Sequence, residues 1–286
     1  MTTRELTHEV AGCRMSFSID GAGTPVLFIQ GTGVHGAAWQ PQIDVLRAQH
    51  TCLSFDNRGM GKSQPQGAKI TIPQMASDAL ALMDAAGWDD AHIVGHSLGG
   101  IVAQELALQA PMRVRSLSLL CTFSRGLDAM QLSPWMIWTG FRSRVGTRAM
   151  RRAAFLEFML SPAELTQVDV AILAKQLEPV FGHDLADQPP VVIAQMRAMG
   201  GYDASPRLAE IAHIPTLVVS AESDRISPPW VGRKIAANFA GARYEELPDA
   251  SHGVPVMQAD VINGLLRDHF LAVDGRKNRT ASGGRP

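Results

Sequence analysis

The sequence predicts an α/β fold built on a mostly parallel, doubly wound sheet, and two observations carry this prediction. Short apolar runs of strand length are typical of strands that are buried on both faces. Five such runs lie at Val26–Ile29, Thr51–Phe55, His92–Val94, Val114–Leu120 and Thr216–Val219. Helical patterns lie between them, and strands that alternate with helices favour a parallel sheet. These patterns cover Ala37–Ala48, Ile72–Ala86, Leu98–Gln109, Pro229–Phe239 and Pro255–Leu271.

Three segments depart from this alternation. Residues Leu6–Asp20 alternate polar and apolar side chains, which predicts a partly exposed antiparallel strand or hairpin. Residues 125–205 carry helical patterns without a convincing strand, so we expect a helical insertion between two strands of the sheet. Residues 275–286 are polar and glycine-rich, and we expect a frayed tail there. The predicted sheet domain therefore comprises residues 1–124 and 206–274.

The composition argues against several classes of protein. The chain has 286 residues with 26 basic and 27 acidic side chains, so it offers no electrostatic footprint for nucleic acid. It has no apolar run of about 18 residues, and we expect no membrane span. Arg4 and Glu5 lie where a signal peptide needs an apolar stretch, which favours a cytoplasmic protein. The distant cysteines Cys13, Cys52 and Cys121 argue against a disulfide framework or a metal site.

The most informative motif is Gly95-His96-Ser97-Leu98-Gly99, which matches the pattern G-x-S-x-G. A predicted strand precedes it and a predicted helix follows it, as this motif requires. A sharp turn between them holds the serine in a strained conformation, and the glycines avoid clashes where strand and helix cross. The hydroxyl of Ser97 would then lie exposed above the sheet, at the positive end of a helix. We expect Ser97 to be a nucleophile.

A serine hydroxyl needs a general base, and in this order of elements an acid and then a histidine follow the serine. His252 lies in a loop between the strand-like run Tyr244–Leu247 and the last helix, where ligand sites open in such sheets. The other downstream histidines are less well placed. His183 falls in the insertion, His213 precedes a strand at the opposite edge, and His269 is expected on the surface of the final helix.

The carboxylate that orients the histidine should lie on another loop at the end of a strand. Asp224 follows the predicted strand Thr216–Val219 and leads into the next helix, so it is the first candidate. Glu222 competes with it locally. Asp249 lies three residues before His252 and could instead cap or brace that loop.

An acyl-transfer site also needs hydrogen-bond donors where the oxyanion develops. The backbone N–H of Leu98, directly after the nucleophile, is one expected donor. The second should come from the loop after the strand Val26–Ile29, which reads Gln30-Gly31-Thr32-Gly33. We assign the N–H of Thr32 to this role and place Gly31 against the substrate.

Two glycine-rich stretches also resemble parts of a phosphate-binding loop. No Gly-Lys-Ser/Thr closes the stretch Gly31–Gly33. The stretch Gly59–Ser63 does contain Gly-Lys-Ser, but Asp56 stands where that motif needs a glycine. We interpret the second stretch as a turn, and nucleotide binding is not expected.

Taken together, these motifs resemble the α/β-hydrolase superfamily over nearly the whole chain, and within it the bacterial esterase and enol-lactonase branch. The segment Phe55–Ser63 resembles the family's D-x-R-G-x-G-x-S stretch, which shapes the loop below the site. The resemblance implies a mostly parallel eight-stranded sheet with a helical cap inserted after the sixth strand, where the predicted insertion falls. One departure is Gln30-Gly31, where the family usually has His-Gly, so the hydrogen bonding of that loop must differ.

The resulting hypothesis is a serine hydrolase of carboxylic esters or lactones, working without metal or cofactor, as a monomer or homodimer. The serine in the elbow argues against haloalkane dehalogenases and epoxide hydrolases, which resemble this architecture but carry an aspartate there. Cofactor-free haloperoxidases or perhydrolases and C–C bond hydrolases share the triad and stay open. A ligand-binding receptor that keeps the fold is the alternative from another class.

The substrate pocket is expected under the insertion. Trp135 and Trp138 are the candidate substrate-binding residues there, although packing within the insertion is the better explanation for most of the aromatic residues in this segment. A run of arginines between 142 and 152 has helical spacing and is interpreted as a solvated face, so we expect an uncharged, fairly apolar substrate. Methionine suits surfaces that adapt to varied partners. Six methionines predict a tolerant lid: Met130, Met136, Met150, Met159, Met196 and Met199.

Overall fold

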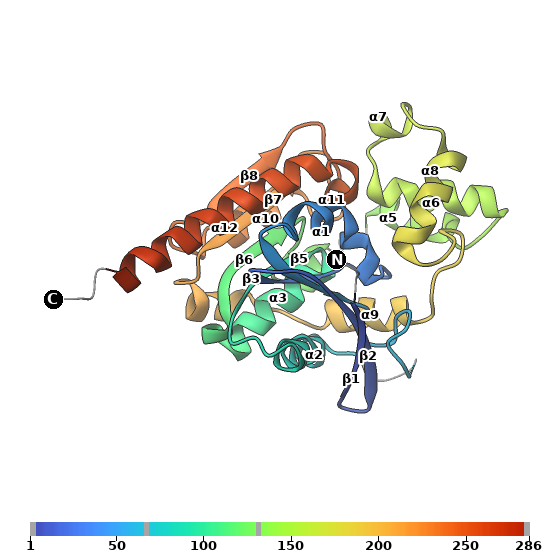
Figure 1. Ribbon diagram of the computed structural model, residues 1–286. Coiled ribbons are helices and arrows are strands. Elements are labelled where there is room, and N and C mark those ends of the chain that lie inside the picture. Colours follow the sequence, from blue (N-terminus) through green and yellow to red (C-terminus); the bar gives the residue numbers. More distant parts are fainter. Residues whose placement is uncertain (1–3, 66–68, 130–132, 283–286) are drawn as a thin grey trace.

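A computed structural model describes residues 4–65, 69–129 and 133–282, and its centre is one eight-stranded sheet (Figure 1). The N-terminal hairpin is antiparallel, β2 pairs antiparallel with β4, and the other pairings are parallel. This confirms the predicted mostly parallel sheet. In spatial order the strands are β1 (Arg4–Val10), β2 (Cys13–Gly21), β4 (His50–Phe55), β3 (Thr24–Ile29), β5 (Ala91–His96), β6 (Val114–Leu120), β7 (Thr216–Ala221) and β8 (Arg243–Leu247).

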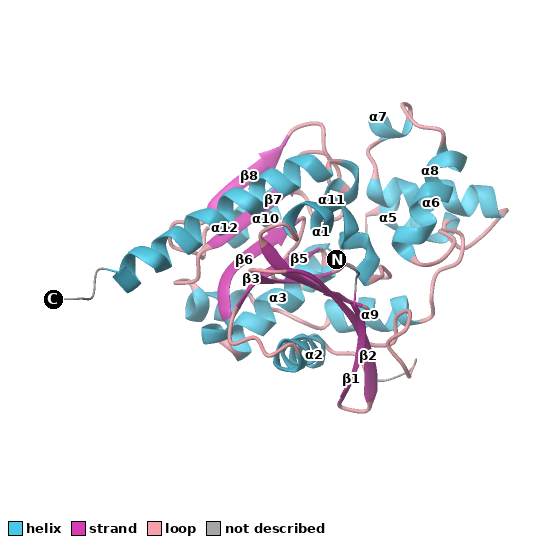
Figure 2. Cartoon of the chain, in the orientation of Figure 1, coloured by secondary structure: helices cyan, strands magenta, loops and turns pink. Residues whose placement is uncertain are grey.

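Helices cover both faces of the sheet, as a doubly wound fold requires (Figure 2). Helices α2 (Ile72–Ala85), α3 (Leu98–Gln109) and α10 (Pro229–Ala236) pack their buried side chains into one apolar cluster with the strands. Helices α1 (Gln40–Leu46) and α12 (Ala259–Ser282) form a second cluster on the other face. Short helical turns cover Gly36–Trp39, Pro111–Arg113, Ser205–Ile211 and, as α11, Val254–Met257.

The helical insertion leaves the sheet after β6 and returns to it at β7, as predicted. Its part from α5 to α8 stands to one side of the sheet and has a small apolar cluster of its own, whereas Met199 of α9 joins the core cluster (Figure 1). We call residues 125–205 the cap. Its helices are α4 (Gly126–Ala129), α5 (Pro134–Arg142), α6 (Arg148–Met159), α7 (Pro162–Leu165), α8 (Val170–Phe181) and α9 (Val191–Gly200).

The C-terminal helix departs from one expectation. Helix α12 runs on to Ser282, into the segment 275–286 for which we expect a frayed tail, although Gly275 costs about 1 kcal/mol relative to alanine within it. His269 is buried rather than on the surface. It lies seven residues after Ile262, two helical turns along the same face, which packs onto the sheet. Residues 1–3, 66–68, 130–132 and 283–286, and with them Met130, lie outside the described residues.

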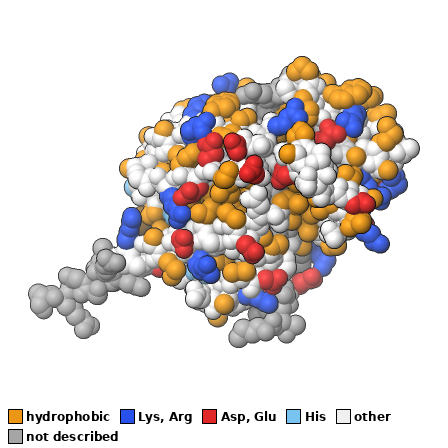
Figure 3. Space-filling view, turned by 90° about the horizontal axis from the view of Figure 1, so that it is seen from above, with side chains coloured by type: hydrophobic (Ala, Val, Ile, Leu, Met, Phe, Trp, Pro, Cys, Tyr) orange, Lys and Arg blue, Asp and Glu red, His pale blue; other side chains and the backbone are white. Residues whose placement is uncertain are grey.

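On the face shown in Figure 3, acidic and basic side chains are mixed over the surface, with apolar side chains between them. No helix in the described ranges combines the length and the apolar character that a membrane crossing requires.

Candidate active site

Ser97 lies at the turn between β5 and α3, with φ 54° and ψ −120°. L-residues rarely adopt a positive φ, so this turn stores strain. The flanking glycines are required by space. A Cβ on Gly95 would lie 2.3 Å from the carbonyl oxygen of Gly99, and one on Gly99 would lie 2.0 Å from that of Ile29. The motif thus folds as the elbow that the sequence predicted.

His252 and Asp224 form a buried pair beyond the ends of β7 and β8. Nδ1 of His252 donates to Oδ2 of Asp224 at 2.7 Å. The other carboxylate oxygen accepts the amides of Ile226 and Ser227 at 2.8 and 2.9 Å, so both oxygens of Asp224 are held in place. Nε2 is then the ring nitrogen of His252 that is left for proton transfer.

The competing candidates occupy other places. The carboxylate of Glu222 accepts the backbone amide of Asp249 at 3.2 Å, so Glu222 braces the loop before His252. His213 is exposed before β7. His183 lies beside the loop after β3, where its Nε2 is 3.3 Å from the carbonyl oxygen of Gly33.

His96, the residue between Gly95 and Ser97, is a second histidine of the site that sequence reasoning missed. Its Nε2 lies 3.0 Å from the backbone oxygen of His252, and the two rings are 4.9 Å apart. Burial, and then the nearby ring of His252, lower the pKa of His96 to about 3. An imidazole that stays neutral adds no second positive charge beside His252. The signal in the sequence was its place inside the elbow motif.

The loop after β3 reaches the same site. Gln30, in place of the family's usual histidine, donates its side-chain amide to the carbonyl oxygen of Phe55 at 2.5 Å. The side chain of Asn57 bonds back to the carbonyl of Gln30 at 3.4 Å. Gly31 and Thr32 line the cavity. Leu98 is the first residue of α3, so its amide has no carbonyl acceptor one turn earlier in that helix.

The loop from Asp56 to Ser63 supports this arrangement from below. The carboxylate of Asp56 accepts the amides of Gly36 at 3.0 Å and Lys62 at 2.9 Å. Arg58 forms an almost completely buried ion pair with Asp78, at 2.5 Å. The stretch with Gly-Lys-Ser is therefore a turn, as the sequence analysis inferred.

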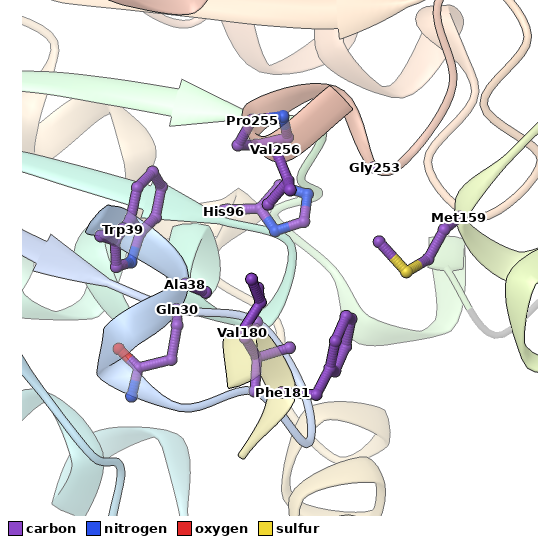
Figure 4. Close-up of a pocket in the computed structure, with 12 residues that line it drawn as sticks. Gln30, Ala38, Trp39, His96, Met159, Val180, Phe181, Gly253, Pro255 and Val256 are labelled. Atoms are coloured by element: carbon purple, nitrogen blue, oxygen red, sulfur yellow. The ribbon is translucent and has the colours of Figure 1, made fainter. Parts of the chain in front are cut away.

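A cavity of about 240 Å³ lies between the sheet edge and the cap, and Ser97, His252, Gly31 and Thr32 all line it. A smaller cavity of about 40 Å³, whose lining is drawn in Figure 4, shares His96, Met159 and Phe181 with the larger one. The wall of the larger cavity is mostly apolar. Its cap side comprises Met136, Gly140, Ser143, Arg144, Phe155, Phe158, Met159, Phe181, Gln188, Val192, Met196 and Met199.

The two tryptophans proposed as substrate-binding are not among the residues that line either cavity. Met136 and Gly140, four residues apart, place one face of α5 on the cavity. Trp138 lies between them on the opposite face, where it is 58% exposed. Trp135 packs on Phe158 and under the guanidinium of Arg225.

Two further cap expectations have mixed outcomes. Of the predicted lid methionines that the structure describes, Met150 is exposed, while Met136, Met159, Met196 and Met199 line the cavity. The arginine run is not one solvated face. Arg144 lines the cavity, whereas its neighbours in the run form ion pairs with cap carboxylates.

The cap is also hydrogen-bonded to the loop that carries His252, here called the histidine loop. The carbonyl oxygen of Met159, at the end of α6, accepts both the hydroxyl of Ser251 at 2.6 Å and the amide of Gly253 at 2.8 Å. The residues on both sides of His252 are therefore bonded to the cap. Within the described ranges, no group of three or more His, Cys, Asp or Glu side chains is placed to hold a metal ion.

Comparison with known proteins decides the family. A model of the alpha/beta hydrolase fold matches residues 24–256. The chain belongs to this family. Among its relatives, the "Putative carbamate hydrolase RutD" of Azorhizobium caulinodans is 32% identical and the match covers 87% of this chain and 92% of that one. The "Putative non-heme bromoperoxidase BpoC" of Mycobacterium tuberculosis is 30% identical, over 91% and 98%.

Solved structures agree with this assignment. A hydrolase from Pseudomonas aeruginosa is 28% identical with a TM-score of 0.78, and the match covers 95% of this chain and 98% of that one. "Est816 as an N-Acyl homoserine lactone degrading enzyme" is 25% identical with a TM-score of 0.77, over 92% and 99%. The chain is a hydrolase of the α/β fold.

Proposed function

We propose that this protein is a serine hydrolase that cleaves carboxylic esters or lactones through an acyl-enzyme. One observation carries the proposal: Ser97, on its strained elbow, and His252, which is hydrogen-bonded to the buried carboxylate of Asp224, line the same cavity. A serine, a base and a group that orients the base are the parts that nucleophilic acyl transfer needs.

In the proposed mechanism, Oγ of Ser97 attacks the substrate carbonyl while Nε2 of His252 takes its proton. Asp224 holds the proton on Nδ1 and stabilises the imidazolium that forms. The amides of Leu98 and Thr32 donate to the oxyanion. The imidazolium then gives its proton to the leaving alcohol. Water, deprotonated by His252, attacks the acyl-enzyme and releases the acid.

The cavity supports a small, uncharged and fairly apolar substrate. Its volume of about 240 Å³ is small for a ligand pocket, and methionine and phenylalanine dominate its cap side. The smaller cavity beside His96 would take a short apolar group of the same substrate. Arg144 is the one residue other than histidine with an ionisable side chain among the described lining residues, so a carboxylate-bearing ester belongs in the substrate panel as a contrast.

The test is hydrolysis by the wild type and Ser97→Ala of p-nitrophenyl esters of graded chain length, with lactones and aryl carbamates beside them. The carbamates are included because relatives are named for carbamate hydrolysis. We expect esters or lactones to be the better substrates and Ser97→Ala to lower kcat by about 10⁴-fold or more. Undiminished ester hydrolysis by Ser97→Ala would refute the mechanism.

The alternatives predict other results. Halide oxidation or perhydrolysis that exceeds ester hydrolysis would favour the haloperoxidase or perhydrolase reaction, for which the likeness to the bromoperoxidase-named relative is the present support. Turnover of vinylogous diketones alone would favour C–C hydrolysis. A fluorophosphonate probe addresses the receptor alternative, since a folded protein that forms no adduct at Ser97 would not be an enzyme of this kind.

A further inference from the structure

Gln195 of α9 connects the cap to the loop that carries the second expected oxyanion donor. Its side chain is fully buried, and its Oε1 accepts the backbone amide of Gly33 at 2.9 Å, across 162 residues of sequence. On the other side of the same residue, Nε2 of His183 lies 3.3 Å from the carbonyl oxygen of Gly33, while Nδ1 of the same ring lies 2.9 Å from the carbonyl oxygen of Asp184. Both polar backbone atoms of Gly33 therefore lie within hydrogen-bond distance of cap side chains.

The loop has two faces, and Gln195 lies on only one of them. Gly31 and Thr32 line the cavity, whereas neither Gly33 nor Gln195 does. Gly33 has φ +70°, and a Cβ there would lie 2.9 Å from Cγ2 of Val192, one turn before Gln195. Helix α9 thus packs closely behind the loop, and its Gln195 binds the backbone amide of Gly33 on the side away from the cavity.

The chemistry of the Gln195 side chain shows that packing alone does not explain it. Its Nε2 is buried and has no hydrogen-bond partner among the described residues. An orphaned buried donor costs about 1–3 kcal/mol, which an apolar side chain of the same size would avoid. The favourable contribution of this glutamine is its acceptor oxygen, and that oxygen bonds to the loop.

We propose that Gln195 is a positioning residue that fixes the loop Gln30–Gly33, here called the oxyanion loop, so that the amide of Thr32 faces the reacting carbonyl. The loop alternates glycines, Gly31 and Gly33, and glycine has the most backbone freedom to lose. By accepting the amide of Gly33, Gln195 sets the peptide plane next to Thr32 and removes a competing donor. The inference rests on the proposed serine-hydrolase function, because only that chemistry uses the oxyanion.

The test compares Gln195→Met with Gln195→Glu. Methionine keeps the length and volume of the side chain but offers only a weakly accepting thioether sulfur, whereas glutamate retains an acceptor oxygen. For the best ester of the panel, we expect Gln195→Met to lower kcat about 10- to 100-fold, below the full loss of one oxyanion donor, with KM changed less than about threefold. Gln195→Glu should recover at least part of that loss. Gln176→Met, on the exposed side of α8, is the matched control.

A second readout separates positioning from a general structural role. With a trifluoromethyl ketone analogue, Oγ of Ser97 adds to the ketone carbonyl and His252 takes the serine proton. The bound adduct then carries an oxyanion. The matching methyl ketone binds without this charge. Gln195→Met should weaken the trifluoromethyl ketone in proportion to the loss in kcat and leave the methyl ketone unchanged. Equal weakening of both ketones, or an unchanged kcat, would overturn the inference.

Two outcomes are kept apart by this design. If Gln195→Met does not fold, as judged by its thermal transition, Gln195→Asn carries the same expectation, because its acceptor is one methylene too short to reach Gly33. If the wild type neither hydrolyses esters nor reacts with fluorophosphonate, the proposed function fails. If the wild type is active and the Gln195 variants match it, only the inference about Gln195 fails.

Discussion

The sheet core and the cap differ in their most buried ion pairs. Among the described residues, the two most buried pairs both lie in the core, Arg58 with Asp78 at 2.5 Å and His252 with Asp224 at 2.7 Å, although the core also has exposed pairs such as Lys62 with Glu5. The cap keeps its ion pairs at the surface, as where Arg148 meets Asp184. Removing one partner of a buried pair leaves an uncompensated buried charge, whereas exposed pairs contribute little. This difference suits a core that holds the proposed catalytic groups and a cap whose interior shapes the substrate.

The division is incomplete at two points. The backbone oxygen of Met159 holds the residues beside His252, and Gln195 holds Gly33 in the loop after β3. Both histidine and oxyanion loops are therefore bonded to the cap, one at the end of α6 and the other along α9. The predictions below separate what belongs to the core from what belongs to the cap.

The largest expected effect lies in the core. Asp224→Asn keeps the shape of the side chain but favours the wrong histidine tautomer, because an amide in this place can donate to Nδ1. We expect kcat for ester hydrolysis to fall about 10⁴-fold. Glu222→Gln is the control and should stay within about threefold, since the side chain of Glu222 accepts the amide of Asp249 and not the ring of His252. Equal losses of kcat in the two variants would show that the orienting role does not belong to Asp224 specifically.

The second effect contrasts the stability of the two regions. Arg58→Met leaves Asp78 as an unpaired buried carboxylate and also removes bonds to the carbonyls of Val10 and Ala11. We expect urea unfolding to show a loss of about 3–5 kcal/mol. Arg142→Met, which breaks the half-exposed cap pair with Glu157, should cost less than about 1 kcal/mol. A cap variant as damaging as the core variant would contradict the comparison.

The third effect is the response to acid. Burial lowers the pKa of His269 to about 4, and burial also lowers the pKa values of His50 and His92 next to it in the core. The unfolded chain then binds protons near pH 6.5 that the folded core takes up only at lower pH. Stability therefore falls as the pH drops from about 6.5 towards 4, by roughly 3 kcal/mol for His269 alone.

The cap should resist that range of pH. A hydrogen bond from Arg152 holds the pKa of Asp184 below its usual value of 3.8, so the stability from this group is lost only below about pH 4. Urea unfolding between pH 7.5 and 4.5 should give a flatter pH dependence for His269→Gln than for the wild type. His213→Gln, at an exposed site, should keep the wild-type slope. An unchanged slope in His269→Gln would show that this histidine is not the acid-sensitive group.

The sequence was informative where the structure is local. The elbow around Ser97 needs only a strand, a turn and a helix in succession, so its φ of 54° follows from a short motif. The positions of Asp224 and His252 followed from the rule that strand ends meet at one edge. Periodicity also predicted α5, but it could not tell which face of that helix the cap would turn inward. Trp138 was therefore placed on the cavity, where Met136 lies instead.

Contacts across long sequence separations were beyond such reasoning. Gln195 lies 162 residues from Gly33, and nothing in the pattern of α9 singles it out from other polar residues. His269 was misplaced for a related reason. A polar residue on an amphipathic helix is usually outside, and only the packing of α12 along the sheet shows that it is inside.

The smallest expected effect concerns the methionine wall of the cap. Met196 on α9 lines the cavity, and its flexible, unbranched side chain can adjust to acyl groups of different length. Met196→Ile replaces it with a β-branched side chain that has one preferred rotamer in a helix. We expect the ratio of kcat/KM between the best and the next-best ester chain length to rise about threefold to tenfold, since a misfitting methylene costs about 1–3 kcal/mol.

Met150→Ile is the control for this wall, because Met150 is 54% exposed on the cap and does not line the cavity. It should leave the profile over chain length unchanged, while both variants should keep the wild-type reactivity of Ser97 towards a small fluorophosphonate. A profile that sharpens in Met196→Ile alone would assign substrate choice to the cap. If instead Met196→Ile lowers kcat for all chain lengths equally, α9 acts on the reacting groups through Gln195 rather than on the substrate chain.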